Sequence, residues 1–265
     1  MEAVRGAADP SGGWKLADSR DAPASAFMRN RPLLLGHRGA RPTSRFSLKS
    51  KAQVPQENTV DCFEYALSQG VDGFEFDVRI TRDHRLVICH NAWVGGSKVS
   101  SSSYDTLCSR GGPFACLETI LRAFAHRAYL DIEVKVEGAE EAIVAAVYRY
   151  RPQRGFVISS FHPGALQRFH EIDASLPLGY VCQRAASLPR WRKLPVQILL
   201  PHYKLLTKKL VDEVHQRGLR AITWTVNGEQ SLRQVAEWGI DGVISDDPAL
   251  LSRTFRSPRA LANSE

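Results

Sequence analysis

The sequence lacks the features of a membrane-spanning or disordered chain. None of its apolar runs approaches the roughly 20 residues that a helix needs to cross a bilayer. Hydrophobic residues make up 43% of the chain and charged residues 24%, which excludes a mostly disordered or collagen-like protein. The 265 residues are enough for a substantial core, and α/β barrels of this length are usually a single domain.

Cysteine is scarce, and its spacing matches no metal or redox motif. The five cysteines are odd in number and include no C-x-x-C pair. We therefore interpret them as free thiols in a reducing compartment rather than as disulfides. Residues 1–30 lack the apolar core of a secretory signal and mix acids with bases, so we expect a flexible N-terminal leader there. Together these observations predict a cytoplasmic protein.

Acidic residues are outnumbered by basic ones, 28 to 35, which gives a net charge of +7. This balance favours an acidic partner or substrate, but it is no evidence of nucleic-acid binding, and we expect no nucleic-acid partner. The segment Arg41–Gln53 contains four cations and no acid, namely Arg41, Arg45, Lys49 and Lys51. Two interpretations stay open for it: a solvated spacer, or a loop that makes transient contact with an anionic membrane surface.

Short apolar runs alternate with helical patterns from Arg31 onward, and eight of these runs follow a mostly βα order. The expected strands are Leu33–Leu35, Phe74–Ile80, Tyr129–Lys135, Phe156–Ser160, Leu178–Val181, Ile198–Leu200, Ala221–Val226 and Gly242–Ser245. Eight is the strand count of a closed (β/α)8 TIM barrel, which we place at residues 31–252 with a C-terminal tail at 253–265. An open doubly wound sheet is less favoured because no G-x-G-x-x-G follows the first strand.

A ninth run, Leu86–Cys89, follows the second barrel strand after a short linker, Thr81–His84. Four residues cannot form a parallel crossover, so the two strands must form an antiparallel hairpin. The returning strand then brings His90 back beside Glu75 and Asp77. Asn58 and Thr59, farther upstream, are good N-cap residues for the first helix.

Acidic residues recur at period-two spacing on two of the expected strands. Glu75 and Asp77 form E-x-D on the second strand, and Glu133 and Lys135 form E-x-K on the third. The carboxyl ends of barrel strands meet at one face, so these side chains should converge. Three carboxylates buried together need a cation, and Ca²⁺ and Mg²⁺ bind carboxylate oxygens. The pattern therefore predicts a divalent metal site at Glu75, Asp77 and Glu133.

Two histidines and two cations flank this acidic cluster. His37 ends the first strand and His90 ends the hairpin, which suggests a general acid and a general base. Arg38 and Lys135 add the positive charge that a phosphate requires. A Ser-His-Asp triad is the competing hypothesis, and it is disfavoured because the serines that end the fourth strand lack a G-x-S-x-G motif. Hydrolysis of an anionic phosphodiester fits these residues best.

The motifs LLLGHRGA, PQENT, GFEFDVRITRD, LVICHN, LDIEVK, ITWTVN and DGVISDDP occur in this order. In that order they resemble glycerophosphodiester phosphodiesterases, from about Leu33 to about Leu250. The resemblance implies a (β/α)8 barrel that uses a divalent metal to hydrolyse glycerophosphodiesters to glycerol 3-phosphate and an alcohol.

The resemblance also implies the role of each site residue. It makes His37 and His90 the acid/base pair, the three carboxylates the metal ligands, and the two cations the phosphate-binding groups. It adds Glu57 of the E-N-T motif as a support of the site. Trp224 of T-W-T-V-N would line the pocket as an apolar wall for the glycerol carbons, although a core tryptophan explains it equally well.

Three departures from the family pattern bear on the function. The family usually has His-Asp where this chain has His90-Asn91, the segment before E-N-T is longer, and VGGSKVSSSSYDTLCSRGG replaces the usual Arg-Thr-Thr-rich stretch. Two alternatives to the leading hypothesis therefore stay open. One is a lysophospholipase D-like lipid phosphodiesterase, and the other is a catalytically silent barrel that binds phosphodiesters.

Overall fold

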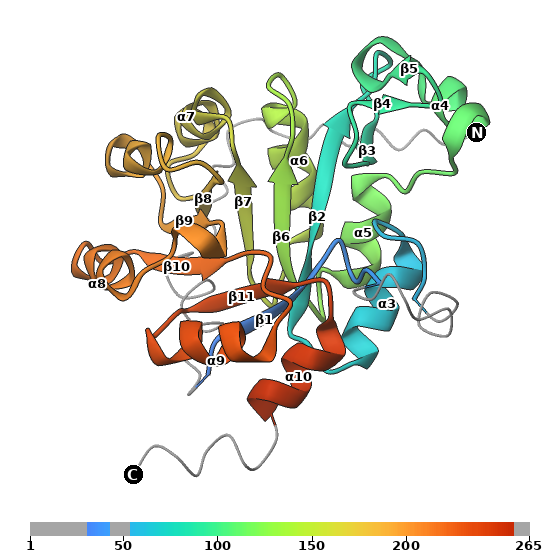
Figure 1. Ribbon diagram of the computed structural model, residues 1–265. Coiled ribbons are helices and arrows are strands. Elements are labelled where there is room, and N and C mark those ends of the chain that lie inside the picture. The colour runs from blue at the N-terminus through green and yellow to red at the C-terminus, as the bar shows by residue number, and fades with distance from the viewer. Residues whose placement is uncertain (1–30, 43–53, 257–265) are drawn as a thin grey trace, which may run out of the picture.

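The computed structural model describes residues 31–42 and 54–256 (Figure 1). Eight parallel strands form a closed barrel, because β1 pairs with both β2 and β11. The barrel strands are β1 (Leu33–His37), β2 (Gly73–Ile80), β6 (Tyr129–Val134), β7 (Phe156–Ser160), β8 (Leu178–Cys182), β9 (Ile198–Pro201), β10 (Arg220–Thr223) and β11 (Gly242–Ser245). The (β/α)8 prediction is confirmed.

Helices cover the outside of the barrel (Figure 1). They are α3 (Val60–Ser68), α5 (Leu117–Phe124), α6 (Glu140–Tyr150), α7 (Pro163–Ile172), α8 (Lys208–Gln216), α9 (Glu229–Glu237) and α10 (Pro248–Arg256). Three short 3₁₀ helices are η1 (Val99–Ser101), η2 (Leu188–Lys193) and η3 (Tyr203–Leu205). Between β8 and β9, η2 stands where a barrel helix would otherwise lie. Helix α10 continues past residue 252, where the sequence pattern placed the end of the barrel.

The antiparallel return strand after β2 is also present. Strand β3 (Leu86–Ile88) pairs with β2, with Val78 opposite Ile88. A second hairpin follows, formed by β4 (Trp93–Val94) and β5 (Ser97–Lys98). Helix α4 (Tyr104–Gly111) lies beside this β4–β5 hairpin instead of on the outside of the barrel (Figure 1). The expected leader at 1–30 and most of the basic segment Arg41–Gln53 lie outside the described residues. Within the described ranges, no helix is both long and apolar enough to cross a membrane.

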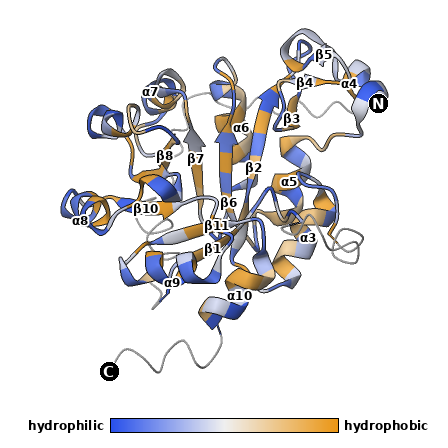
Figure 2. Cartoon of the chain, viewed as in Figure 1, coloured by the Kyte–Doolittle hydropathy of each residue, from blue (hydrophilic) through white to orange (hydrophobic). Residues whose placement is uncertain are grey.

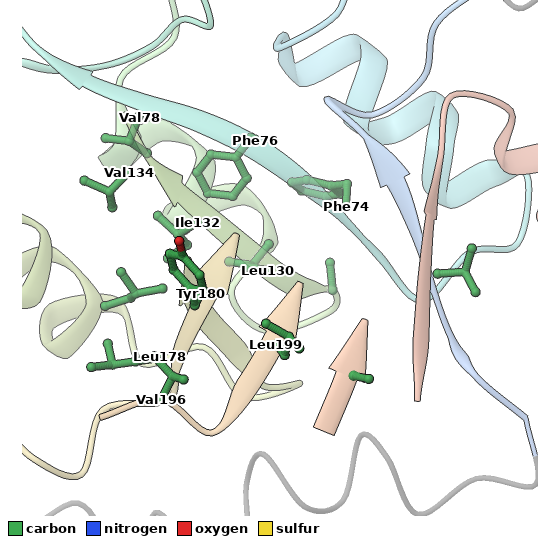
Figure 3. Close-up of a cluster of buried hydrophobic side chains, with 14 of the residues drawn as sticks. Phe74, Phe76, Val78, Leu130, Ile132, Val134, Leu178, Tyr180, Val196 and Leu199 are labelled. Carbon is green, nitrogen blue, oxygen red and sulfur yellow. The ribbon is translucent and has the colours of Figure 1, made fainter. Parts of the chain in front are cut away.

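The period-two pattern of β2 divides its side chains between two environments. Hydrophobic and hydrophilic residues alternate along β2 in Figure 2, and Figure 3 shows Phe74, Phe76 and Val78 packed beside side chains of β6. Phe63 of α3 stacks on Phe74 with the ring centroids 4.1 Å apart. Because alternate residues on a strand point to opposite faces, burying the phenylalanines under the helices turns Glu75 and Asp77 into the barrel.

Two details of the expected elements are corrected. The first helix is capped by Thr59, whose side chain accepts from Cys62 N, whereas Asn58 has a φ of 61° and lies before the cap. Strand β10 ends at Thr223 rather than at Val226. The chain leaves the sheet there, so Trp224 stands at the mouth of the barrel rather than in the middle of a strand.

Candidate active site

The three predicted metal ligands, on β2 and β6, meet at the carboxyl end of the barrel, the end to which the arrowheads of these strands point in Figure 1. Asp77 lies opposite Glu133 in the parallel register, and Glu75 lies opposite His37 of β1. One carboxylate oxygen from each of the three acids lies within 4.8 Å of the others, and all three residues are buried. The cluster could therefore bind a divalent metal ion.

The electrostatics of this cluster are unfavourable without a cation. Burial, reinforced by the charges of Asp77 and Glu133, raises the pKa of Glu75 well above its usual range. Burial also raises the pKa of Glu133. Oxygen Oε1 of Glu75 is buried and accepts no hydrogen bond from the described residues, while Oε2 accepts one from Arg38 N at 3.0 Å. A buried carboxylate oxygen with no hydrogen-bond partner among the described residues is suited to bind a hard cation.

Two cations and one amide partly balance the charge of Asp77. Burial opposes ionisation of this carboxyl, but Lys135 and Arg38 together hold its pKa below the usual value. Lys135 Nζ lies 3.2 Å from Oδ1, and Arg38 Nε lies 3.1 Å from Oδ2. Asn58 Nδ2 donates to Oδ2 at 2.9 Å. Lys135 also forms a close ion pair with Glu133, so the two cations predicted to bind phosphate are anchored by the acids.

Glu57 anchors Arg38 from the other side. Its Oε1 accepts from Arg38 Nη1 at 2.9 Å, and its Oε2 lies 2.5 Å from Arg41 Nε. The structure therefore brings Glu57 of the E-N-T motif to the site beside Arg38. Arg41 is the one cation of the basic segment that the structure describes.

His90 reaches the cluster through the β2–β3 hairpin. Cys89 N donates to the Asp77 carbonyl at 2.9 Å, which places the following residue beside the acids. Arg79 holds the His90 carbonyl with two hydrogen bonds, from Nε at 3.0 Å and from Nη2 at 2.8 Å. Burial lowers the pKa of His90, against the opposite effect of Asp77. Its Nδ1 lies 3.0 Å from Oδ1 of Asn91.

Trp224 lies across the barrel mouth from the hairpin residues. Its Nε1 donates to the Leu200 carbonyl at 2.9 Å, and its ring meets Phe161 edge-on at 5.6 Å between centroids. Lys135 Nζ lies 5.5 Å from the centroid of the same Phe161 ring. Trp224 thus packs on the barrel interior and remains half-buried, so it is linked to the site through Phe161.

Several residues that sequence reasoning missed also belong to the site. Asp246 directly follows β11, and its Oδ1 lies 2.7 Å from Nδ1 of His37. Asn58 was interpreted only as a helix cap, yet its amide binds Asp77. Asp131 lies one layer deeper in the barrel, where burial raises its pKa to about 7 and Ser159 Oγ donates to it at 2.6 Å. The signal for Asp246 was its position at the end of a barrel strand.

A cleft of about 300 Å³ opens beside His90. It is lined by the loop before α3, by the residues from Ile88 to Gly95, and by the loop that follows α4. Val94 and Phe114 in its wall pack on a small separate apolar cluster. Trp93, also in the wall, is 62% exposed and is the one exposed large hydrophobic side chain among the described residues. The segment that departs from the family pattern, residues 94–112, contributes Val94, Gly95 and Gly111 to this cleft.

The fold and the site together define a class: a TIM-barrel enzyme whose carboxylates, histidines and cations converge at the carboxyl ends of the strands. The model of the glycerophosphoryl diester phosphodiesterase family matches residues 37–250, and the chain belongs to this family. The members of that family are phosphoric diester hydrolases.

Individual relatives agree with this assignment. A glycerophosphodiester phosphodiesterase of Caldanaerobacter subterraneus subsp. tengcongensis is 26% identical over 84% of this chain and 98% of its own length. The rat lysophospholipase D GDPD1 is 23% identical over 77% of this chain and 83% of its own. In fold, the chain resembles an Oleispira antarctica phosphodiesterase solved with the product sn-glycerol-3-phosphate, with a TM-score of 0.69 at 22% identity, covering 84% and 96% of the two chains.

The repulsion within the acidic cluster predicts an effect of metal on stability. Because the pKa of Glu75 is raised, its ionisation destabilises the metal-free fold as the pH rises above the ordinary glutamate pKa. We expect Glu75→Gln to melt at a higher temperature than the wild type in EDTA at pH 8. Adding Ca²⁺ or Mg²⁺ should raise the melting temperature of the wild type and have little effect on the variant.

Differential scanning fluorimetry measures both effects. Glu140→Gln is a matched control, because Glu140 is also buried but lies outside the cluster and binds Gly138 N. This control should retain the metal response. Equal metal responses in the wild type and in Glu75→Gln would contradict a metal site at this cluster.

Proposed function

We propose that the chain hydrolyses glycerophosphodiesters to glycerol 3-phosphate and an alcohol. The observation that carries the proposal is the buried cluster of Glu75, Asp77 and Glu133, with two histidines and two cations around it. Family membership supports it, as does the product named in the Oleispira structure.

The three carboxylates are the proposed ligands of a divalent ion, Ca²⁺ or Mg²⁺, since both ions prefer carboxylate oxygens. When bound, such an ion neutralises charge on the phosphoryl oxygens as a Lewis acid. Arg38 and Lys135 lie against Asp77 with their remaining donors available to the phosphate. Glu57 and Asn58 hold Arg38 and Asp77 in place, and Trp224 forms an apolar wall for the glycerol carbons.

His37 and His90 are the proposed proton-transfer groups. One removes a proton from the attacking oxygen and the other protonates the leaving alcohol. The attacking oxygen belongs to water or to the neighbouring hydroxyl of the substrate, and the second route passes through a cyclic phosphate. The presence of both histidines beside the cluster favours an active enzyme over a silent binding barrel.

The direct test is release of glycerol 3-phosphate from glycerophosphocholine, with and without EDTA. We expect turnover that EDTA abolishes and that Ca²⁺ or Mg²⁺ restores, because EDTA removes the divalent cation that neutralises charge on the phosphoryl oxygens. Transient cyclic phosphate, followed by ³¹P NMR, distinguishes attack by the substrate hydroxyl from attack by water. Binding of the diester without turnover at any metal concentration would instead identify a silent barrel.

The cleft beside His90 is the proposed site for the alcohol half of the substrate. Its wall carries Trp93 and Phe114, and none of its described lining residues is a lysine or arginine. An aromatic face attracts a quaternary ammonium group by about 0.5–2 kcal/mol. This composition favours choline over an uncharged alcohol.

We therefore expect Trp93→Ala to lower the kcat/KM for glycerophosphocholine relative to that for glycerophosphoglycerol by about 3- to 30-fold. Trp93→Phe should keep most of the preference, because the aromatic face remains. Ser100→Ala, an exposed position seven residues farther along the chain that does not line the cleft, serves as the control and should leave the ratio unchanged. Equal losses for both substrates would show that Trp93 only supports the hairpin.

A lysophospholipase D-like activity is the second candidate, and charge distribution favours it. Residues 174–211 contain seven lysines and arginines and no aspartate or glutamate. The charge of this segment, +7, equals the net charge of the whole chain. This segment includes η2 and η3, which follow the carboxyl ends of β8 and β9 at the mouth of the barrel. We propose that it contacts an anionic membrane surface when the substrate is a lipid.

Vesicle sedimentation tests this contact. Arg190→Ser/Lys193→Ser should weaken binding to phosphatidylglycerol vesicles at low salt, and the difference should fade as salt screens the charges. Arg127→Ser/Arg154→Ser is the matched control, since these residues precede β6 and β7 at the opposite end of the barrel. Equal binding by the two double variants would contradict a specific contact, and turnover of lysophosphatidylcholine in the same vesicles tests the activity.

A cytoplasmic location is proposed as well. All five cysteines are free thiols, and three of them are buried. Burial raises the pKa of Cys62 to about 11 and that of Cys182 to about 12, so both thiols stay protonated and unreactive. This use of cysteine suits a reducing compartment.

A further inference from the structure

Residues of two of the sequence motifs lie together beside His37, one in contact with its ring and the other in contact with that partner. T-W-T-V-N ends in Asn227, in the loop after β10, and DGVISDDP carries Asp246, directly after β11. Asp246 Oδ1 lies 2.7 Å from His37 Nδ1, and both side chains are mostly buried, at 15% and 12% exposure. Neither Asn227 nor Asp246 has a role in the proposed chemistry above, so their convergence needs its own explanation.

Asn227 fixes the orientation of the Asp246 carboxylate. Its Nδ2 donates to Asp246 Oδ2 at 2.7 Å, and its Oδ1 accepts from Asp246 N at 2.9 Å and from Ser245 Oγ at 3.0 Å. A backbone N–H only donates, so the amide of Asn227 cannot turn over without losing these bonds. Arg41 Nη1 faces the same carboxylate at 3.9 Å. Both oxygens of Asp246 are therefore assigned, one to Asn227 and one to His37.

We infer that Asp246 is a positioning residue that sets the tautomer of His37. A carboxylate only accepts hydrogen bonds, so the hydrogen of the neutral imidazole must lie on Nδ1. The lone pair is then on Nε2, the nitrogen that lies 3.8 Å from Glu75 Oε2 and faces the acidic cluster. The catalytic consequence rests on the proposed function, in which His37 exchanges a proton with the substrate through Nε2.

His90 provides the contrast within the same site. Its Nδ1 partner is the amide of Asn91, which is exposed. An amide accepts through its oxygen or, turned over, donates through its nitrogen, so it imposes no tautomer on the ring. The structure thus assigns a fixed tautomer to His37 alone of the two histidines.

The arrangement makes Asp246→Asn a specific probe. Asn227 Nδ2 and His37 Nδ1 both donate to position 246, and an asparagine side chain offers one oxygen where aspartate offers two. If that oxygen stays with Asn227, the new amide nitrogen faces His37 Nδ1 and moves the imidazole hydrogen to Nε2. The lone pair is then removed from the nitrogen that faces the substrate.

A double substitution should reverse this effect. In Asp246→Asn/Asn227→Asp, the new carboxylate at 227 accepts from Asp246 N and Ser245 Oγ as the amide oxygen did, and it also accepts from the amide nitrogen at 246. The amide oxygen at 246 is then turned to His37 Nδ1. The correct tautomer returns, although the acid has moved to the neighbouring position.

The first measurement is steady-state kinetics on glycerophosphocholine with saturating metal. We expect Asp246→Asn to lower kcat by about 10²- to 10⁴-fold, as the loss of an orienting carboxylate does elsewhere, with KM changed less than about threefold. The double variant should recover at least about tenfold of the lost kcat. Asn91→Ala is the control, because it removes the hydrogen-bond partner of His90, and this partner does not fix the tautomer of the ring.

The second measurement does not depend on activity. Two-dimensional ¹⁵N NMR of histidine-labelled protein, with the His37 signals assigned from His37→Gln, reports which nitrogen carries the hydrogen. We expect hydrogen on Nδ1 in the wild type, on Nε2 in Asp246→Asn, and on Nδ1 again in the double variant and in Asn91→Ala. Hydrogen on Nε2 in the folded wild type would overturn the inference whether or not any variant folds.

The two measurements separate the inference from the proposed function. A wild type that shows the predicted tautomer but hydrolyses no diester would leave the positioning intact and refute the proposed activity. A double variant with the corrected tautomer and no recovery of kcat would overturn the catalytic part of the inference. An Asp246→Asn variant with wild-type kcat would do the same.

Discussion

The burial of three carboxylates at one end of the barrel is the constraint on which the rest of the site depends. Like charges in a poorly solvated site repel, and each must be matched by a cation or lose its ionisation. The surroundings of Asp77 follow from this requirement, since Lys135, Arg38 and Asn58 all reach its oxygens. Glu75 retains an oxygen that no described residue satisfies. The protein thus balances one carboxylate by itself and leaves another to be balanced by an ion.

The same constraint explains the alternation along β2. Phe74 and Phe76 must face the helices because Phe63 and Phe124 pack there in stacked and edge-on contacts. A shift of one residue would expose the phenylalanines to the polar barrel mouth and press Glu75 and Asp77 into the apolar layer. Packing outside the barrel therefore fixes the charges inside it, so the core and the site specify the same register.

Features that depend on local periodicity could be predicted from the sequence. The E-x-D pattern predicted that Glu75 and Asp77 point to the same side of their strand. The four-residue linker predicted the antiparallel hairpin that places His90 beside them. The family resemblance supplied the roles that are proposed for Glu57 and Trp224. Features that depend on distant contacts could not be predicted in this way. Asp246 and His37 are 209 positions apart; the closed barrel predicts that β11 and β1 lie side by side, but no short spacing indicates that these two side chains share a hydrogen bond.

Asn58 illustrates a different limit of sequence reasoning. Asparagine before a helix is a good capping residue, but Thr59 already satisfies that role, and the left-handed φ of Asn58 directs its amide to Asp77 instead. Asparagine therefore suits this position, but its function there is to bind Asp77 rather than to cap the helix. η2 shows a second limit, since the mostly βα order of the sequence did not indicate that the proline-containing and basic segment Leu188–Lys193 forms a 3₁₀ helix in place of a barrel helix.

The departure at Asn91 acquires a physical meaning beside Asp246. A barrel with two carboxylate-partnered histidines would hold two similar groups next to an acidic cluster. In this chain, one histidine has a mostly buried acid as its partner and the other has an exposed amide. A carboxylate accepts hydrogen bonds only, whereas an amide can accept or donate one, so the two partners constrain their rings differently. The two rings therefore differ in their hydrogen-bond surroundings. A reaction that needs a proton donor on one side of a phosphate and a proton acceptor on the other is compatible with that difference.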